Sequence, residues 1–199
     1  MTDFTEIKNN LKKIGYKVTT FEKGCEAVEY IGRAIKDSTV GIGGSQTIKE
    51  LNLYEVLINN NNDVYWHWIM EPETAITNAM TADYYITSVN AIAQSGEMVN
   101  IDGRGNRVSA SLYGHKKVFY IIGKNKITKT YDDAIYRARN VAAPLNAKRL
   151  NKKTPCAVSG NGCASCNSPE RICKAMVTYW GPMSGMETEV ILIDENYVY

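Results

Sequence analysis

Short, continuous apolar runs constrain the fold of this 199-residue chain more than any other feature. Residues 84–89 and 118–122 are two such runs, closed by Asn90 and Gly123. Runs without strict apolar–polar alternation are typical of central strands that are buried on both faces of a parallel sheet. Amphipathic segments of helix length stand between the apolar runs. We therefore predict an α/β fold with a mainly parallel sheet and helices on both faces.

The same patterns place the other elements along the chain. Apolar residues at helical spacing predict helices over residues 2–14, 24–35, 45–59 and 130–150, the last kinked or ended by Pro144. Further strands are predicted over residues 16–21, 38–42, 64–70 and 190–193. We also predict a hairpin over residues 96–108 around the glycines of residues 102–106, and helices beginning at Pro72 and at residues 168–170. No linker is evident, so residues 1–199 should form a single domain.

Composition and charge exclude several classes of protein. The chain has 23 basic and 21 acidic residues and a net charge of +2, too balanced for a nucleic-acid-binding surface. No segment approaches the roughly 18 apolar residues of a membrane span. The N-terminus lacks the apolar region of a secretory signal. We expect a cytoplasmic protein with neither nucleic-acid nor membrane partners.

A glycine-rich turn, residues 41–47 with the sequence GIGGSQT, lies where a predicted strand meets a helix. Gly43 and Gly44 permit a sharp bend with exposed N–H groups, and Ser45 and Thr47 add hydroxyls, so these four residues predict a site for phosphate or carboxylate. The turn matches neither a Walker A loop nor a dinucleotide fingerprint, and no nucleotide cofactor is evident. The alternative is an ordinary tight turn with a serine helix cap.

A second polar cluster follows the apolar run of residues 84–89. Thr87, Ser88 and Asn90 lie at its carboxyl end, where open α/β sheets bind ligands. Glu97 and Asp102 are the nearest carboxylates and are our candidate catalytic acid or base. The alternative is that Thr87 and Asn90 only hydrogen-bond the turn and that Asp102 caps the hairpin. Arg107 could bind a ligand carboxylate through its planar guanidinium, although hairpin arginines are usually solvated.

Four cysteines lie close together in a loop over residues 155–173: Cys156, Cys163, Cys166 and Cys173. Four thiolates can hold zinc or an iron–sulfur cluster, and the sequence does not decide between them. The spacing fits neither template well, so a redox pair of Cys163 with Cys166 and inert packed cysteines are alternatives. The two histidines are isolated. His67 is predicted to be a partly exposed spacer in a strand.

Several blocks of the sequence together resemble the lactate-utilisation (LUD) domain family, in its short, cysteine-bearing branch. They are residues 41–47, 82–93, 96–103, 106–108, 117–127 and the cysteine segment 155–173. The resemblance implies a fold akin to ribose-5-phosphate isomerase, glucosamine-phosphate deaminase and CoA transferases, in which the glycine turn holds phosphate or CoA-like groups. It also implies a role in bacterial lactate oxidation, often beside iron–sulfur partner subunits.

Our leading hypothesis is a lactate-utilisation protein with a pocket for a small anionic ligand or an acyl/CoA-type group. One alternative is a non-catalytic subunit that organises an iron–sulfur oxidation complex. Another is an enzyme similar to the sugar-phosphate isomerases. Whether the chain is catalytic on its own stays open at this stage.

Overall fold

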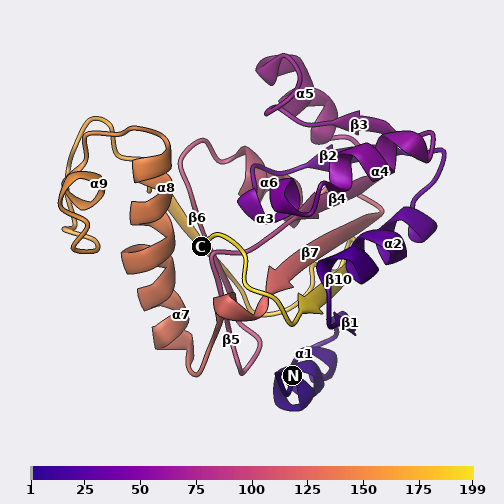
Figure 1. Ribbon diagram of the computed structural model, residues 1–199, viewed down its shortest axis with the longest axis horizontal. Helices are drawn as coiled ribbons and strands as arrows, with labels where there is room; N and C mark the ends of the chain where they lie inside the picture. The colour runs from indigo at the N-terminus through magenta and orange to yellow at the C-terminus, as the bar shows by residue number, and fades with distance from the viewer. Residues whose placement is uncertain (1) are drawn as a thin grey trace.

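The computed structural model describes residues 2–199 and contains two sheets (Figure 1). The larger sheet is wholly parallel, which confirms the predicted fold class. In spatial order its strands are β1 (Lys17–Phe21), β10 (Glu187–Ile193), β7 (Lys117–Gly123), β4 (Tyr84–Thr87), β2 (Thr39–Ile42) and β3 (Asp63–Tyr65). Because β7, β4 and β2 are parallel neighbours, their carboxyl ends meet at one edge of the sheet.

Alternate side chains of the central strands pack on opposite faces, as strand geometry requires. On one face Val118, Tyr120 and Ile122 contribute to a core. The helices that supply residues to this core are α1 (Thr5–Lys13), α5 (Pro72–Ala79) and α6 (Asn106–Leu112). On the other face Phe119 and Ile121 contribute to a second core. Its helices are α2 (Gly24–Ala34), α3 (Gln46–Glu50) and α4 (Leu53–Asn59).

The smaller sheet and one long helical segment form a separate layer, on the left of Figure 1. The strands, in spatial order, are β8 (Ile127–Thr128), β5 (Ala91–Ala93), β6 (Met98–Asp102) and β9 (Ala175–Tyr179). The helical segment consists of α7 (Tyr131–Arg137), the π-helical turn η2 (Ala138–Ala142) and α8 (Ala143–Arg149). Ala134 and Ala138 pack it against Ala91 and Val99 of the sheet. The short helix α9 (Pro155–Ser159) lies on the outer side of α8 (Figure 1).

The predicted hairpin around residues 102–106 is wrong. A hairpin does form, but it joins β5 to β6 through the turn at Gly96, whose φ is +113°. After β6 the chain turns into α6 instead, because the Asp102 carboxylate accepts the backbone N–H groups of Arg104 at 3.0 Å and Gly105 at 2.8 Å. A side chain that satisfies such amides starts a helix, as an N-terminal cap does.

Three further predictions about helices need correction. The helix predicted to begin at residues 168–170 is absent from the described chain, which turns there and enters β9. Local hydrogen bonds compete with the helix: the Arg171 guanidinium donates to the carbonyl of Cys173 at 2.8 Å. Pro144 does not end its helix, because the wider π-helical turn before it accommodates the missing N–H. The predicted helix over residues 45–59 is two helices, divided at Asn52, whose φ is +51°.

Candidate functional site

A cavity of about 430 Å³ opens at the carboxyl ends of β2, β4 and β7. Gly44 and Ser45 follow β2, Ser88 follows β4, and Lys126 follows β7; all four line the cavity. The opposite wall comes from the end of β6, from α6 and α8, and from residues 169–174 of the cysteine-bearing segment. The cavity therefore lies between the main sheet and the second layer, at the edge where open α/β sheets bind ligands.

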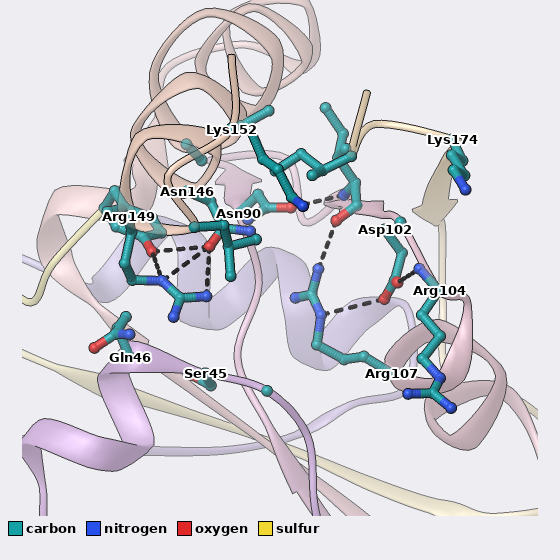
Figure 2. A pocket seen from close by; sticks show the side chains of 18 of the residues that line it. Ser45, Gln46, Asn90, Asp102, Arg104, Arg107, Asn146, Arg149, Lys152 and Lys174 are labelled. Carbon is teal, nitrogen blue, oxygen red and sulfur yellow. Dashed lines mark hydrogen bonds and ion pairs between the residues drawn. The ribbon is translucent and has the colours of Figure 1, made fainter. Parts of the chain in front are cut away.

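Positive charge is concentrated around this cavity (Figure 2). The cationic side chains that line it are Arg104, Arg107, Lys126, Arg149, Lys152, Arg171 and Lys174. The carboxylates among its lining residues are Asp102 and Glu170. Because these cations come from separate segments, the fold gathers charge that the chain's overall balance of +2 conceals. A concave surface with such an excess of positive charge attracts anions.

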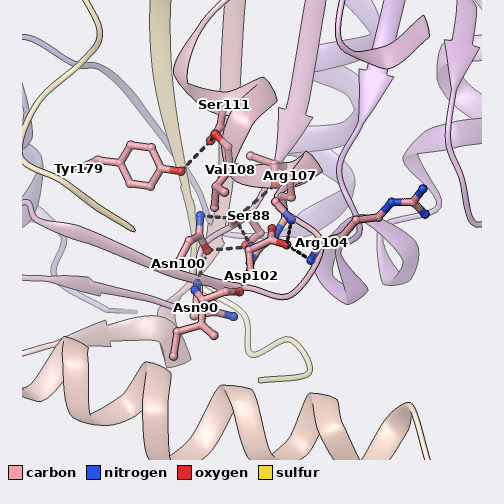
Figure 3. A network of polar contacts seen from close by, with 12 residues as sticks. Ser88, Asn90, Asn100, Asp102, Arg104, Arg107, Val108, Ser111 and Tyr179 are labelled. Carbon is pink, nitrogen blue, oxygen red and sulfur yellow. Dashed lines mark hydrogen bonds and ion pairs between the residues drawn. The ribbon is translucent and has the colours of Figure 1, made fainter. Parts of the chain in front are cut away.

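Several polar contacts anchor Arg107, one of these cations (Figure 3). Its side chain is only 12% exposed. Its guanidinium donates to the Asn100 side-chain oxygen at 2.7 Å and to the Ile101 carbonyl at 2.7 Å. It also donates to the Ser88 carbonyl at 3.3 Å and lies 3.5 Å from the Asp102 carboxylate. These contacts fix the guanidinium at the cavity wall before any ligand arrives.

Arg149 is held in place at the rim. Its Nε donates to the side-chain oxygen of Asn146 at 3.0 Å and to the hydroxyl of Tyr199 at 2.9 Å. Its guanidinium also lies over the ring of Trp68, 5.0 Å from the ring centre. Lys152 lines the cavity beyond Arg149, so the mouth carries cations from α8 and from the segment after it (Figure 2).

Lys126 lies at the inner end of the site, in the 3₁₀ turn η1 (Lys124–Lys126) directly after β7. The residue is 3% exposed, and its amine donates to the Thr47 hydroxyl at 2.8 Å and the Ser88 hydroxyl at 3.1 Å. Burial and, to a smaller extent, the charges of Arg137 and Arg107 together lower the pKa of Lys126 to about 7. Lys126 is not among the site residues predicted from the sequence, although it follows a buried strand and lies in one of the blocks that resemble the LUD domain family.

The glycine turn contributes to the cavity, with its residues in different roles. Gly44 and Ser45 line the cavity, and the Ser45 hydroxyl accepts the backbone N–H of Ile48 at 3.4 Å. Gly43 lies behind them, where a Cβ atom would be 2.8 Å from the Thr87 hydroxyl oxygen, closer than real Cβ atoms pack. Thr47 is fully buried and accepts the hydrogen bond from Lys126. Glycine is thus needed here for close packing.

The second predicted cluster is also brought to the cavity, apart from one carboxylate. Ser88, Asn90 and Asp102 line the cavity, and Thr87 is buried beneath them. The Asn90 side-chain oxygen accepts the backbone N–H of Ile101 at 2.6 Å, which joins the segment between β4 and β5 to β6. Glu97 lies in the turn between β5 and β6, where it accepts a hydrogen bond from Ser95, and it does not line the cavity.

His67 is partly exposed, as predicted, but it lies in the turn after β3 and not in a strand. It lines the cavity, and its ring lies 3.3 Å from where a Cβ atom on Gly44 would be. Burial lowers the pKa of His67, and the positive charge of Arg104 lowers it further, so the ring is neutral at neutral pH. A neutral imidazole at this place can hydrogen-bond a ligand without adding charge.

The cysteine-bearing segment forms part of the cavity wall through Glu170, Arg171 and Ile172. The Arg171 guanidinium donates to the Cys173 sulfur at 3.2 Å and to the Cys166 carbonyl at 3.3 Å. Within residues 2–199, no three cysteine, histidine or carboxylate side chains are gathered as metal ligands. In this arrangement the Arg171 guanidinium is a hydrogen-bond partner of the Cys173 thiol.

Zinc or an iron–sulfur cluster held by Cys156, Cys163, Cys166 and Cys173 stays a prediction. Elemental analysis and an absorption spectrum of anaerobically purified protein would test it. Iron with sulfide would indicate electron transfer, and zinc would indicate a structural role.

Comparison with known proteins bears on the whole chain. The family model described as LUD domain matches residues 4–193. The chain belongs to the LUD domain family. This family is associated with lactate utilisation. A crystal structure of a DUF162 family protein from Deinococcus radiodurans has a similar fold, with a TM-score of 0.54 and 14% sequence identity. The similarity covers 97% of this LUD domain protein and 99% of that chain.

No curated protein matches the sequence. Within residues 2–199, no helix has the length and apolar character that crossing a membrane requires.

Proposed function

We propose that this LUD domain protein binds a small organic anion in the cationic cavity, as its part in lactate utilisation. The observation that supports the proposal is the concentration of arginine and lysine side chains around a concave site at the carboxyl edge of the sheet. Its volume of about 430 Å³ falls within the range of roughly 300–1,000 Å³ that small-molecule sites occupy. Carboxylates and phosphates, including the phosphates of an acyl-CoA, share the chemistry that the cavity recognises.

The arrangement suggests how each group contributes. Arg149 and Lys152 meet the anion at the rim, and the planar guanidinium of Arg149 can hold a carboxylate or phosphate through two parallel hydrogen bonds. Arg107 supplies fixed positive charge at the wall, since its contacts with Asn100 and Ile101 hold it in one orientation. Groups already fixed lose little side-chain entropy on binding, which favours affinity.

Isothermal titration calorimetry with inorganic phosphate and with L-lactate tests this proposal. The Arg149→Gln/Lys152→Gln variant should bind the anion about tenfold or more weakly, since a hydrogen bond to a charged group contributes about 1.5–3 kcal/mol. Lys148→Gln is the matched control, because Lys148 is an exposed cation on the same helix and does not line the cavity. Equal affinities in all three proteins would refute the anion site.

A second measurement separates an enzyme from a non-catalytic subunit of an iron–sulfur complex. Turnover of a hydroxy acid or an acyl-CoA by the purified protein alone would indicate an enzyme. Turnover only after iron–sulfur partner subunits are added would indicate a subunit that binds the anion for them.

A further inference from the structure

Lys126 is buried without a carboxylate partner, which is unusual for a lysine with a purely structural role. Buried lysines usually pair with a carboxylate, because an isolated buried charge is costly. Within residues 2–199, no carboxylate forms an ion pair with Lys126, and its amine contacts only the hydroxyls of Thr47 and Ser88. Lys126 and Ser88 both line the cavity. A buried amine is thus presented at a site that other side chains equip for anions.

The same surroundings favour the uncharged amine. The pKa of Lys126 is lowered to about 7, mainly by burial and further by the cations Arg137 and Arg107, against a smaller opposing effect of Glu50. At neutral pH the Lys126 amine is therefore uncharged in a large fraction of the molecules. Desolvation and neighbouring cations activate lysines as nucleophiles toward carbonyl groups. Recognition of the anionic group does not require a charge on Lys126, because the arginines and lysines of the rim and wall provide it.

We propose that Lys126 forms an imine with the carbonyl carbon of an anionic aldehyde or ketone held in the cavity. The inference rests on the proposed anion site and deepens it by naming the substrate class, a small carbonyl compound that carries a carboxylate or phosphate. It assigns Lys126 as the catalytic nucleophile, with Ser88 and Thr47 as the hydroxyls that handle protons beside it.

The reaction balances without an oxidant or reductant. The lone pair of Nζ attacks the carbonyl carbon, a C–N bond forms, and the π electrons of the C=O bond move to the oxygen, which takes up a proton. The nitrogen loses one proton, which the adjacent Ser88 or Thr47 hydroxyl can relay to that oxygen. The resulting carbinolamine loses its hydroxyl and a second proton from nitrogen as water, and the C=N bond forms. Amine and carbonyl thus give imine and water.

Borohydride trapping tests the proposal. The intact protein is incubated with pyruvate, an anionic ketone, or glyoxylate, an anionic aldehyde, and sodium borohydride is added. We expect one reduced adduct per chain with at least one of these probes, mapped by peptide mass spectrometry to Lys126. L-Lactate, which has no carbonyl to attack, should give no adduct. An excess of inorganic phosphate should suppress labelling by occupying the anion site.

Variants separate this reaction from random labelling. Lys126→Met and Lys126→Arg should lose the adduct, with circular dichroism and phosphate calorimetry showing that each is folded and still binds the anion. Lys148→Met, which removes an exposed lysine outside the cavity, should be labelled like the unaltered protein.

The outcomes distinguish the two proposals. Phosphate binding without an adduct on Lys126 from either probe would overturn the imine and leave the anion site standing. An adduct that phosphate does not suppress, or that persists in the Lys126 variants, would also overturn it. If the unaltered protein does not bind phosphate, the proposed anion site itself is refuted.

Discussion

The guanidinium carbon of Arg149 lies 5.0 Å from the centre of the Trp68 ring. Arg149 belongs to α8 and Trp68 to the loop after β3, so this contact joins the second layer to the edge of the main sheet at the cavity rim. Trp66 stacks on Trp68, with ring centres 5.4 Å apart. The rim cation thus rests on an aromatic platform, the partly buried Trp68 ring, which packs against the core that contains Trp66.

Removal of that platform should weaken anion binding without removing any charge. We predict that Trp68→Leu lowers the affinity for inorganic phosphate about twofold to fivefold, because a cation–π contact at an exposed site contributes about 0.5–1 kcal/mol. Titration calorimetry measures the change. Trp180→Leu is the control, since Trp180 is 71% exposed and does not line the cavity. Equal effects of the two substitutions would contradict a role for the platform.

Gly103 lets the cysteine-bearing segment close against the cavity. A Cβ atom at Gly103 would lie 2.5 Å from the backbone oxygen of Ile172, and both residues line the cavity. We predict that Gly103→Ala displaces residues 171–174, weakens phosphate binding and lowers Tm by roughly 2–10 °C, since overpacking costs about 1–3 kcal/mol.

Gly181→Ala provides the comparison for this prediction. A Cβ atom there would lie 3.6 Å from its nearest neighbour, the Ile14 carbonyl oxygen, which is an ordinary contact. Calorimetry of phosphate binding and a thermal melt should show little change in this variant. If Gly103→Ala behaves in the same way, the segment does not depend on close packing at Gly103.

The strand pattern was predictable because its physical cause is local in the sequence. Residues 84–89 and 118–122 carry apolar side chains for both faces of a strand. The structure places β4 and β7 in the middle of the sheet, with a core on each face. Because ligands bind at the carboxyl ends of such strands, the pattern predicts Ser88 and Asn90 as site residues, and both line the cavity.

The hidden part of the site depends on contacts between distant residues. Lys126 meets Thr47 across 79 positions of the chain and Ser88 across 38. A lysine after a strand is usually solvated, so nothing in its own segment indicates burial. The prediction of a hairpin at the turn after β6 was also wrong, because glycines around an aspartate are compatible with a hairpin and with the start of a helix. Only the bonds from the Asp102 carboxylate to the amides of Arg104 and Gly105 decide between them.

Glu189 of β10 is fully buried and should make the stability of the sheet depend on Lys117. Its carboxylate lies 2.8 Å from the Lys117 amine and accepts hydrogen bonds from Thr19 at 2.6 Å and Tyr30 at 2.8 Å. Lys117→Met should lower the free energy of unfolding by about 3–5 kcal/mol, because it removes the closer and more buried of the two cations that pair with this buried carboxylate. Urea denaturation measures the loss.

Lys17 supplies a matched control on the same carboxylate. Its amine lies 3.3 Å from Glu189, but its side chain is 52% exposed, whereas that of Lys117 is 13% exposed. Lys17→Met should cost about 1 kcal/mol or less, as exposed ion pairs do. Similar losses in the two variants would show that burial does not govern this cluster.

The Glu189 cluster also predicts a pH dependence of stability. Burial alone would raise the pKa of Glu189, but the hydrogen bonds from Lys117, Thr19 and Tyr30 outweigh it and hold the pKa below its ordinary value. A lowered pKa in the folded state means that the cluster stabilises the protein above the ordinary range of glutamate and loses this contribution as pH falls below it. Urea midpoints should therefore fall below about pH 4.5, and Glu189→Gln should flatten that fall.

Cys163 of the cysteine-bearing segment should react with an alkylating agent at a lower pH than Cys25 does. The backbone N–H of Ser165 donates to its sulfur at 3.4 Å, and Arg139 lies 3.9 Å from it. The Ser165 hydrogen bond is the main cause that lowers the pKa of Cys163, and Arg139 adds to it, so the reactive thiolate is present at lower pH.

In protein treated with a chelator and a reductant, iodoacetamide should label Cys163 at a lower pH than the exposed Cys25 on α2. Arg139→Gln should move the labelling profile of Cys163 toward higher pH and leave that of Cys25 unchanged. Coincident profiles for the two cysteines, read by peptide mass spectrometry, would show that these contacts do not activate Cys163.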